Sequence, residues 1–288
     1  MEHSHHIKEH AGLFRHTENE DIQKDLGKTL SAIKPAYLFI SVAVFYMLII
    51  LLGGYIGRQR LLSGIKEPES SIETAVAAVL GLLAFILGFT FSLTWSKFVL
   101  RNSLVIQHSK AISVCYLRTS LITQRQKMEV RKLLHEYTNI LMEIQSSPEY
   151  EKGLARITQL HMEIWQQTTS LAKEDIDSEL RSLFISSVND LISTALERKT
   201  IALFIRVPNA IWYSVLFLAF ISMLAFGYQA GNSGITKLFQ LPLLPIAFGL
   251  VIVLIAGLNS QNAYKHFRVT KQPLKAVQEM MGKLYYNT

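Results

Sequence analysis

A charge-free apolar stretch, Thr74–Ser96, constrains the fold of this chain more than any other part of its sequence. A transmembrane helix needs about 20 apolar residues, and the stretch is long enough. Polar sequence that still favours a helix follows it, with no glycine or proline in residues 89–147. The sequence therefore predicts one long helix that crosses a membrane and continues into water, with a bend near Thr119 and Ser120.

Small and weakly polar side chains form one stripe along this predicted span. With about 100° of rotation per residue, the stripe is roughly 80° wide and contains Thr74, Ala77, Gly81, Ala84, Gly88, Ser92 and Trp95. Glu73 and Phe91 lie at its edge. Such a stripe either lets a second helix approach closely or lines a narrow aqueous path. The two interpretations coincide if identical helices pack around a common axis.

Composition places the chain among membrane proteins that carry one sizeable soluble segment. Hydrophobic residues make up 50% of the 288 residues, yet 18% of them are charged. The 29 Lys and Arg residues exceed the 22 Asp and Glu residues, but they are scattered around the apolar stretches and do not gather with aromatic residues on one face. We therefore attribute the basic excess to membrane topology and expect no nucleic-acid partner.

Four apolar stretches are candidates for membrane spans. Besides the second, the sequence predicts spans over Ala36–Gly57, Pro208–Tyr228 and Leu241–Leu258. The expected fold is an all-α membrane protein of four transmembrane helices, with a long cytoplasmic helical hairpin between the second and the third. The expected divisions are a cytoplasmic tail with an interfacial helix (1–35), two spans (36–96), a cytoplasmic helical stalk (97–206), two spans (207–260) and an amphipathic tail (261–288).

The basic residues also predict the orientation in the membrane. The two short loops between spans contain few of them, whereas the tails and the stalk carry many close to the apolar stretches: Lys28, Lys34, Lys97, Arg101, Arg198, Lys199, Arg206, Lys265, Arg268, Lys271 and Lys275. The positive-inside rule then places both termini and the stalk in the cytoplasm. We expect a multi-pass protein of the plasma membrane, surrounded by lipid.

The stalk sequence predicts helices whose apolar faces need partners. Its one strong turn signal is Ser146–Gly153, and helical spacing continues on the return arm. A new helix is expected where Asp175 or Asp177 caps it, and a tail helix is expected near Pro273. The apolar stripe of the return arm comprises Leu154, Ile157, Leu160, Ile164, Thr168, Leu180, Leu183, Phe184, Val188, Leu191 and Ala195. Such stripes pack across the hairpin or against neighbouring subunits.

No motif in the sequence predicts catalysis. Walker loops, dinucleotide-binding glycine patterns, zinc-protease motifs and nucleophile elbows do not occur in it. We therefore expect no enzyme activity and no cofactor. His108, His135 and His161 are expected at exposed surfaces. Cys115, the only cysteine, excludes an intramolecular disulfide and is expected as a small packing residue.

Two charged residues have specific expectations. Glu73 lies at the outer mouth of the second span, where it either acts on ions or simply sits in water. Arg118 is expected to form a structural ion pair with an acid of the return arm, such as Asp190 or Glu197.

The N-terminal tail is rich in histidine. A free amino terminus together with His3, His5 and His6 would offer nitrogen ligands that suit copper or nickel. A solvated tail without a metal is the simpler expectation. The tail has no apolar core, so it is not expected to be a secretory signal.

Several short motifs together resemble the bestrophin-like domain family of bacterial membrane proteins. They are GLLAFILGFTFSLTWSKFVLRNSLV, AISVCYLRTSL, NDLISTALERK, RVPNAIWYSVLFL and RVTKQPLKAVQ, in that order. The resemblance implies a bacterial inner membrane, four spans, a cytoplasmic helical insert and kinship with bestrophin anion channels, which are rings of identical subunits lined by the second span. Where family members often carry an acidic segment after the fourth span, this chain has Gly257, Leu258, Asn259, Ser260 and Gln261.

Together these observations predict a homo-oligomeric ion channel of four or five copies that prefers anions. The stripe is expected to line the pore, and Phe91 and Trp95 are expected to narrow it. Lys97 and Arg101 would form a basic ring on the cytoplasmic side that raises the local anion concentration. The alternative is a non-conducting scaffold or sensor whose stalk binds a cytoplasmic partner. A transporter is less consistent with the sequence, because neither an inverted repeat nor a broken helix is evident.

Overall fold

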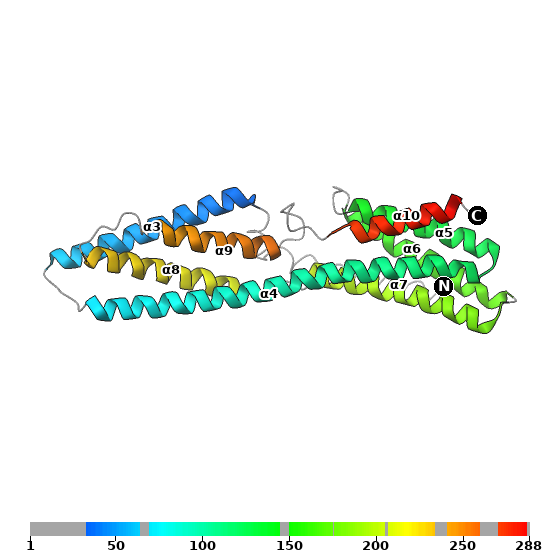
Figure 1. The fold of residues 1–288 in the computed structure, drawn as a ribbon, viewed down its shortest axis with the longest axis horizontal. Coiled ribbons are helices and arrows are strands. Elements are labelled where there is room, and N and C mark those ends of the chain that lie inside the picture. Colours follow the sequence, from blue (N-terminus) through cyan, green and yellow to red (C-terminus); the bar gives the residue numbers. More distant parts are fainter. Residues whose placement is uncertain are drawn as a thin grey trace, which may run out of the picture. The chain divides into compact units, whose positions relative to one another are not determined.

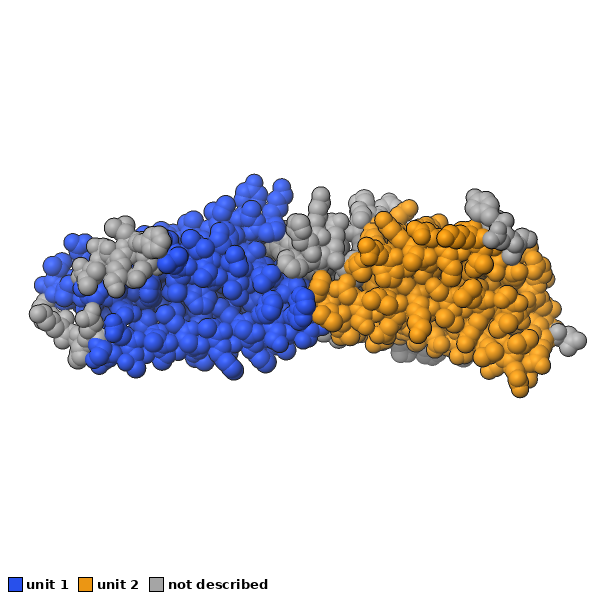
Figure 2. All heavy atoms as spheres, viewed as in Figure 1, with its two compact units in different colours: residues 1–96, 206–267 blue, residues 97–205, 268–288 orange. Residues whose placement is uncertain are grey.

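The structure, a computed structural model, describes residues 33–63, 69–144, 150–174, 176–204, 207–233, 241–259 and 270–286 (Figure 1). Within these ranges the regular elements are helices and no strand is present, so the predicted all-α fold is confirmed. The chain divides into two compact units (Figure 2). Unit 1 takes in Met1–Ser96 and Arg206–Phe267, and unit 2 takes in Lys97–Ile205 and Arg268–Thr288.

Unit 1 is built from apolar helices that form where the four apolar stretches of the sequence predict them. Three helices of the described residues are long and apolar enough to cross a membrane, and α9 is shorter. The bounds are α3 Pro35–Leu62, α4 Glu69–Arg118, α8 Asn209–Asn232 and α9 Leu243–Asn259. Helix α4 belongs to unit 1 as far as Ser96 and to unit 2 from Lys97.

The core of unit 1 lies between these helices, yet their outer surfaces are also apolar. Helix α3 packs against α8 and α9, and α4 adds Leu83 and Leu87 to the same core. On the outside, Leu48, Phe85 and Phe217 are 60%, 69% and 66% exposed. Apolar surface of this extent suits lipid or neighbouring subunits and not water.

Glycines let α3 and α8 approach each other backbone to backbone. A Cβ atom added to Gly53 of α3 would lie 2.9 Å from the amide nitrogen of Tyr228, and Gly57 meets α8 in the same way one turn later. Gly227 and Gly231 of α8 face α3 equally closely. Real Cβ atoms do not come this near to a backbone, so the contact requires glycine at these four positions.

Unit 2 is a bundle of amphipathic helices. Besides α4 from Lys97 onward, it contains α5 Gln124–Glu143, α6 Tyr150–Ser170, α7 Ser178–Phe204 and α10 Gln272–Tyr286. Each helix contributes to one fully buried core that includes Ile112, Leu134, Leu160, Ile164, Phe184, Val188, Leu191 and Met281. The predicted stripe of the return arm is therefore largely buried. Leu180 and Leu183 are corrections, because they are 39% and 44% exposed.

The long helix that begins at Glu69 ends at the predicted bend. The hydroxyl groups of Thr119 and Ser120 donate to main-chain carbonyl oxygens three residues earlier, at 2.7 and 2.6 Å. These bonds compete with regular helical bonding, and a single 3-10 turn, Thr119–Leu121, leads into α5. Side-chain hydroxyls thus explain why α4 stops at Arg118.

The start of α7 also matches the sequence. The Asp177 carboxylate accepts a hydrogen bond from the amide of Glu179 at 2.8 Å, which is the N-cap contact expected of an aspartate there. The tail helix α10 begins at Gln272, next to the predicted Pro273. Three predicted features lie outside the described residues: the interfacial helix of the N-terminal tail, Asp175, and residues 146–149 of the turn.

Candidate functional site

The small-residue stripe of α4 faces away from the core of unit 1. All six predicted pore-lining residues are exposed: Thr74, Ala77, Gly81, Ala84, Gly88 and Ser92. A Cβ atom added to Gly81 or to Gly88 would meet no described atom within 4 Å beyond the backbone of its own helix. Helix α4 instead buries the face that carries Val76, Leu83, Leu87, Thr90 and Thr94. The stripe is thus available to lipid, to water or to another copy of the chain.

Phe91 and Trp95, the predicted constriction, come together in the structure. Their rings stack with centroids 6.5 Å apart and planes inclined by 20°. Phe91 is half-buried and packs against the core of unit 1, whereas Trp95 is 49% exposed. Phe91 therefore supports the position of Trp95, and Trp95 is the ring that projects from the helix.

The charged residues predicted near the two ends of the span have different environments. Glu73 is exposed, and Lys97 and Arg101 are half-buried. Arg118 departs from the prediction. Its Nη1 donates a hydrogen bond of 2.7 Å to the main-chain oxygen of Leu183, and the ion pairs found among the described residues do not include it. The guanidinium thus reaches α7, as expected, but binds a carbonyl group instead of a carboxylate.

A buried polar chain joins four helices of unit 2. Nη1 of Arg198 in α7 lies 3.0 Å from Nδ1 of His108 in α4. Nε2 of His108 lies 2.8 Å from the Tyr137 hydroxyl in α5, which in turn lies 3.1 Å from Nε2 of His161 in α6. His108 and Tyr137 are 1% and 0% exposed. The expectation that His108 and His161 are isolated at exposed surfaces is wrong.

The electrostatics of this polar chain follow from its burial. Burial lowers the pKa of His161 and lowers the pKa of Arg198. Burial raises the pKa of Tyr137, and the charge on Arg198 opposes that rise. Both ion pairs found among the described residues belong to Arg156, so no described carboxylate pairs with Arg198. The cation is instead held by a hydrogen bond to a neutral acceptor.

The burial of His108 can be predicted from its spacing relative to apolar residues of α4, although no other histidine lies near it in the sequence. Leu104, His108, Ile112 and Cys115 follow one another at helical spacing, and all four are at most 1% exposed. The histidine therefore occupies a core position of α4. Sequence spacing predicts its burial, but it does not predict Tyr137 and Arg198 as partners, because these lie 29 and 90 residues away.

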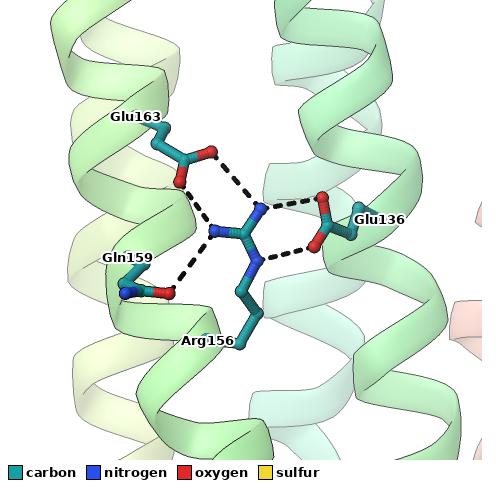
Figure 3. Close-up of polar contacts among 4 residues, drawn as sticks. All are labelled: Glu136, Arg156, Gln159 and Glu163. Carbon is teal, nitrogen blue, oxygen red and sulfur yellow. Dashed lines mark hydrogen bonds and ion pairs between the residues drawn. The ribbon is translucent and has the colours of Figure 1, made fainter.

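A second polar cluster fastens α5 to α6 at the surface of unit 2 (Figure 3). Arg156 donates to both carboxylate oxygens of Glu136, at 2.6 and 2.9 Å. It also donates to Glu163, at 2.6 and 3.4 Å, and to Gln159 at 3.5 Å. Hydrogen bonding to Arg156 lowers the pKa of Glu136. We assign this cluster a structural role, since all its charged groups are paired.

The described residues offer no cluster of three or more His, Cys, Asp or Glu side chains that would hold a metal ion. The N-terminal histidines His3, His5 and His6 lie outside the described residues. Cys115 is fully buried, in agreement with its predicted packing role.

Comparison with known proteins gives the class of this chain. Its apolar helices with apolar outer surfaces are those of a helical membrane protein. The sequence matches the Bestrophin-like domain over residues 40–262. The chain belongs to the Bestrophin-like family, as the motifs of the sequence indicate. No functionally curated protein matches it.

Solved structures share the fold at low sequence identity. A crystal structure of a bacterial bestrophin homologue from Klebsiella pneumoniae that carries a point mutation aligns with a TM-score of 0.60 and 14% identity, over 85% of this chain and 98% of that one. A second mutant of a bacterial bestrophin homologue from Klebsiella pneumoniae aligns with a TM-score of 0.61 and 14% identity, over 83% of this chain and 96% of that one. The crystal structure of another membrane protein aligns with a TM-score of 0.62 and 12% identity, over 87% of this chain and 97% of that one.

Proposed function

We propose that the protein is a homo-oligomeric ion channel whose pore is lined by the small-residue stripe of α4. One observation carries the proposal: the stripe combines weakly polar Thr74 and Ser92 with exposed Gly81 and Gly88, against which no other described helix packs. A helix that faces only lipid gains nothing from glycine, which costs helical stability. Packed around an axis with four or five copies, the same stripe forms a narrow polar path.

Four spans and a cytoplasmic unit 2 belong to this proposal. Helix α9 has 17 residues, which at about 1.5 Å per residue is close to the thickness of a hydrocarbon core. An even number of spans then keeps both termini on one side. The basic residues near the spans favour the cytoplasm for that side, in the inner membrane of a bacterium.

Anions are the proposed permeant ions. Lys97 and Arg101 follow the stripe on α4 within two turns of Trp95, so repetition around an axis would produce rings of positive charge. Such rings attract anions to the pore mouth and repel cations. Trp95 would narrow the path above them, and Glu73 would stand at the other mouth.

The test is ion flux through liposomes that contain the purified protein. We expect chloride flux above that of empty liposomes and a single oligomeric species of four or five copies by mass photometry. A monomer at micromolar concentration contradicts the oligomer. An intact oligomer without flux under varied voltage, pH and tension contradicts the channel and supports a scaffold that binds partners through unit 2.

A further inference from the structure

The hydrogen bonds of the buried polar chain in unit 2 have a fixed direction. A guanidinium group has no acceptor, so Arg198 donates to Nδ1 of His108. Neutral His108 then carries its proton on Nε2 and donates it to the Tyr137 oxygen. The hydroxyl proton of Tyr137 is left for Nε2 of His161, which accepts it. Every donor in this series of hydrogen bonds has an acceptor only when His161 is neutral.

Because its hydrogen bonds all run in this one direction, the polar chain does not conduct protons. Proton transfer along hydrogen bonds requires that each member release a proton and receive one, and Arg198 at the closed end stays protonated at every physiological pH. The open end is His161, which is half-buried, while His108 is 1% exposed and has a cation at Nδ1. One residue of the chain is therefore placed to exchange a proton with water.

We propose that Arg198, His108, Tyr137 and His161 form a proton-operated latch, in which a proton taken up by Nε2 of His161 loosens the hold of α4, α5 and α7 on α6. The proton comes from water and occupies the lone pair of Nε2. Tyr137 keeps its own hydroxyl proton, which loses its acceptor. The new imidazolium also brings a second positive charge into the surroundings of Arg198, where burial weakens screening.

The groups that surround His161 do not offset this charge. His161 contacts Tyr137 of α5, and through it the polar chain continues to His108 of α4 and Arg198 of α7. The acids nearest to Tyr137 and His161 in the sequence are Glu136 on α5 and Glu163 on α6. Both acids are already bound to Arg156. The acids of α7, which are Glu179, Asp190 and Glu197, are exposed to solvent. The protonated state of His161 therefore lacks a free carboxylate partner among the described residues.

The direction of the response follows from burial. Burial lowers the pKa of His161, so the side chain is neutral at neutral pH and the latch is closed. When α6 is opened or the protein is unfolded, the pKa of His161 returns toward about 6.5. Acidification below that value thus favours the opened state of α6, and the effect grows until the lowered pKa of the closed state is passed.

Hydrogen exchange of the full-length protein in detergent tests the latch without any measurement of ion flux. Protection factors, which remove the intrinsic pH dependence of exchange, are compared at about pH 7.5 and about pH 5.5. We expect the protection of α6 to fall about fivefold in acid, the size of one lost hydrogen bond. Equal protection of α6 at the two pH values overturns the proposal.

Two variants and one control make the test specific. His161→Gln keeps an acceptor for Tyr137 but does not titrate, so α6 should stay protected in acid. Tyr137→Phe removes the hydroxyl, so α6 should exchange fast at both pH values. His135→Gln is the control, because this half-buried histidine of α5 stacks edge-on with Tyr116 and lies outside the latch. An acid response that survives in His161→Gln, or that disappears in His135→Gln, overturns the proposal.

Discussion

Gly227 of α8 lies so close to Ile50 of α3 that a Cβ atom added to the glycine would stand 2.8 Å from the carbonyl carbon of Ile50. The backbone of α3 cannot move away without also separating the two helices at Gly53 and Gly57. We expect Gly227→Ala to destabilise the protein by about 1–3 kcal/mol, the usual cost of overpacking. The melting temperature in detergent should fall by several degrees.

A matched control for this substitution exists in the same unit. A Cβ atom added to Gly249 of α9 would lie 3.6 Å from the Phe39 ring, an ordinary contact. Gly249→Ala should therefore leave the melting temperature unchanged or raise it slightly, because alanine favours a helix more than glycine does. Equal melting temperatures for the two variants would show that the close approach of α3 and α8 is not required.

Trp95→Ala should raise ion flux through liposomes. Removal of the projecting ring widens the proposed path and eases its wetting, so we expect at least about a twofold gain in basal flux. Phe89→Ala is the matched control, because this aromatic side chain is 54% exposed but lies on another face of α4. Gly88→Leu should block flux in an intact oligomer. A gain from Phe89→Ala as large as that from Trp95→Ala would contradict the assigned pore face.

The ion pair between Glu136 and Arg156 should stabilise unit 2 only above acidic pH. Hydrogen bonding to Arg156 lowers the folded-state pKa of Glu136, so its contribution is complete above the ordinary value of about 4.3 and disappears as pH falls through the lowered value. We expect Glu136→Gln to lower the melting temperature by about 1–3 °C near neutral pH. The difference from wild type should vanish in strong acid, and a difference independent of pH would contradict the ion pair.

Cys115 should not react with maleimide in the folded protein. The side chain is 0% exposed and lies in the core of unit 2, so labelling should occur only after denaturation. Mass spectrometry of the native and denatured protein checks this. Rapid labelling of the native protein would mean that the core of unit 2 opens readily. An unreactive Cys115 cannot report on which side of the membrane it lies.

Introduced cysteines report on which side of the membrane a residue lies, and the native Cys115 does not interfere with them because it is buried. Ser63, after α3, and Ser193, in α7, are both exposed. The proposed topology places Ser63 outside and Ser193 in the cytoplasm. An impermeant thiol reagent added to intact cells should label Ser63→Cys and spare Ser193→Cys until the cells are opened. The reverse pattern would place unit 2 outside.

Local sequence signals predicted the helices well. Charge-free stretches located the apolar helices, and the hydroxyls of Thr119 and Ser120 and the carboxylate of Asp177 located a helix end and a helix start, because each of these effects acts within a few residues. The spacing of Leu160 and Ile164 likewise predicted a buried face. Leu180 and Leu183 fit the same spacing but are exposed, because burial there depends on which helices pack nearby.

Local sequence patterns could not predict the polar chain of unit 2 or the partner of Arg118. His108 meets Tyr137 and Arg198 only after α4, α5 and α7 have packed together, and no spacing within one helix encodes that meeting. Arg118 was assigned a carboxylate on grounds of charge, whereas the packing of α7 presents the Leu183 carbonyl oxygen to it. The glycine contact of α3 with α8 also depends on tertiary packing, so the sequence did not predict it. In the sequence, glycines near the end of an apolar stretch instead indicate the end of a helix.

Helix α10 imposes an order on the biosynthesis of the protein. Leu274, Val277 and Met281 are at most 4% exposed in the core of unit 2, although α10 follows α8 and α9 in the chain and leaves the ribosome after them. Helices α4 to α7 emerge earlier. In the proposed topology their core stays open on one side while α8 and α9 enter the membrane. The nascent protein therefore exposes an apolar groove of unit 2 until α10 has been synthesised and has packed, and chaperones and proteases would act on it in that period.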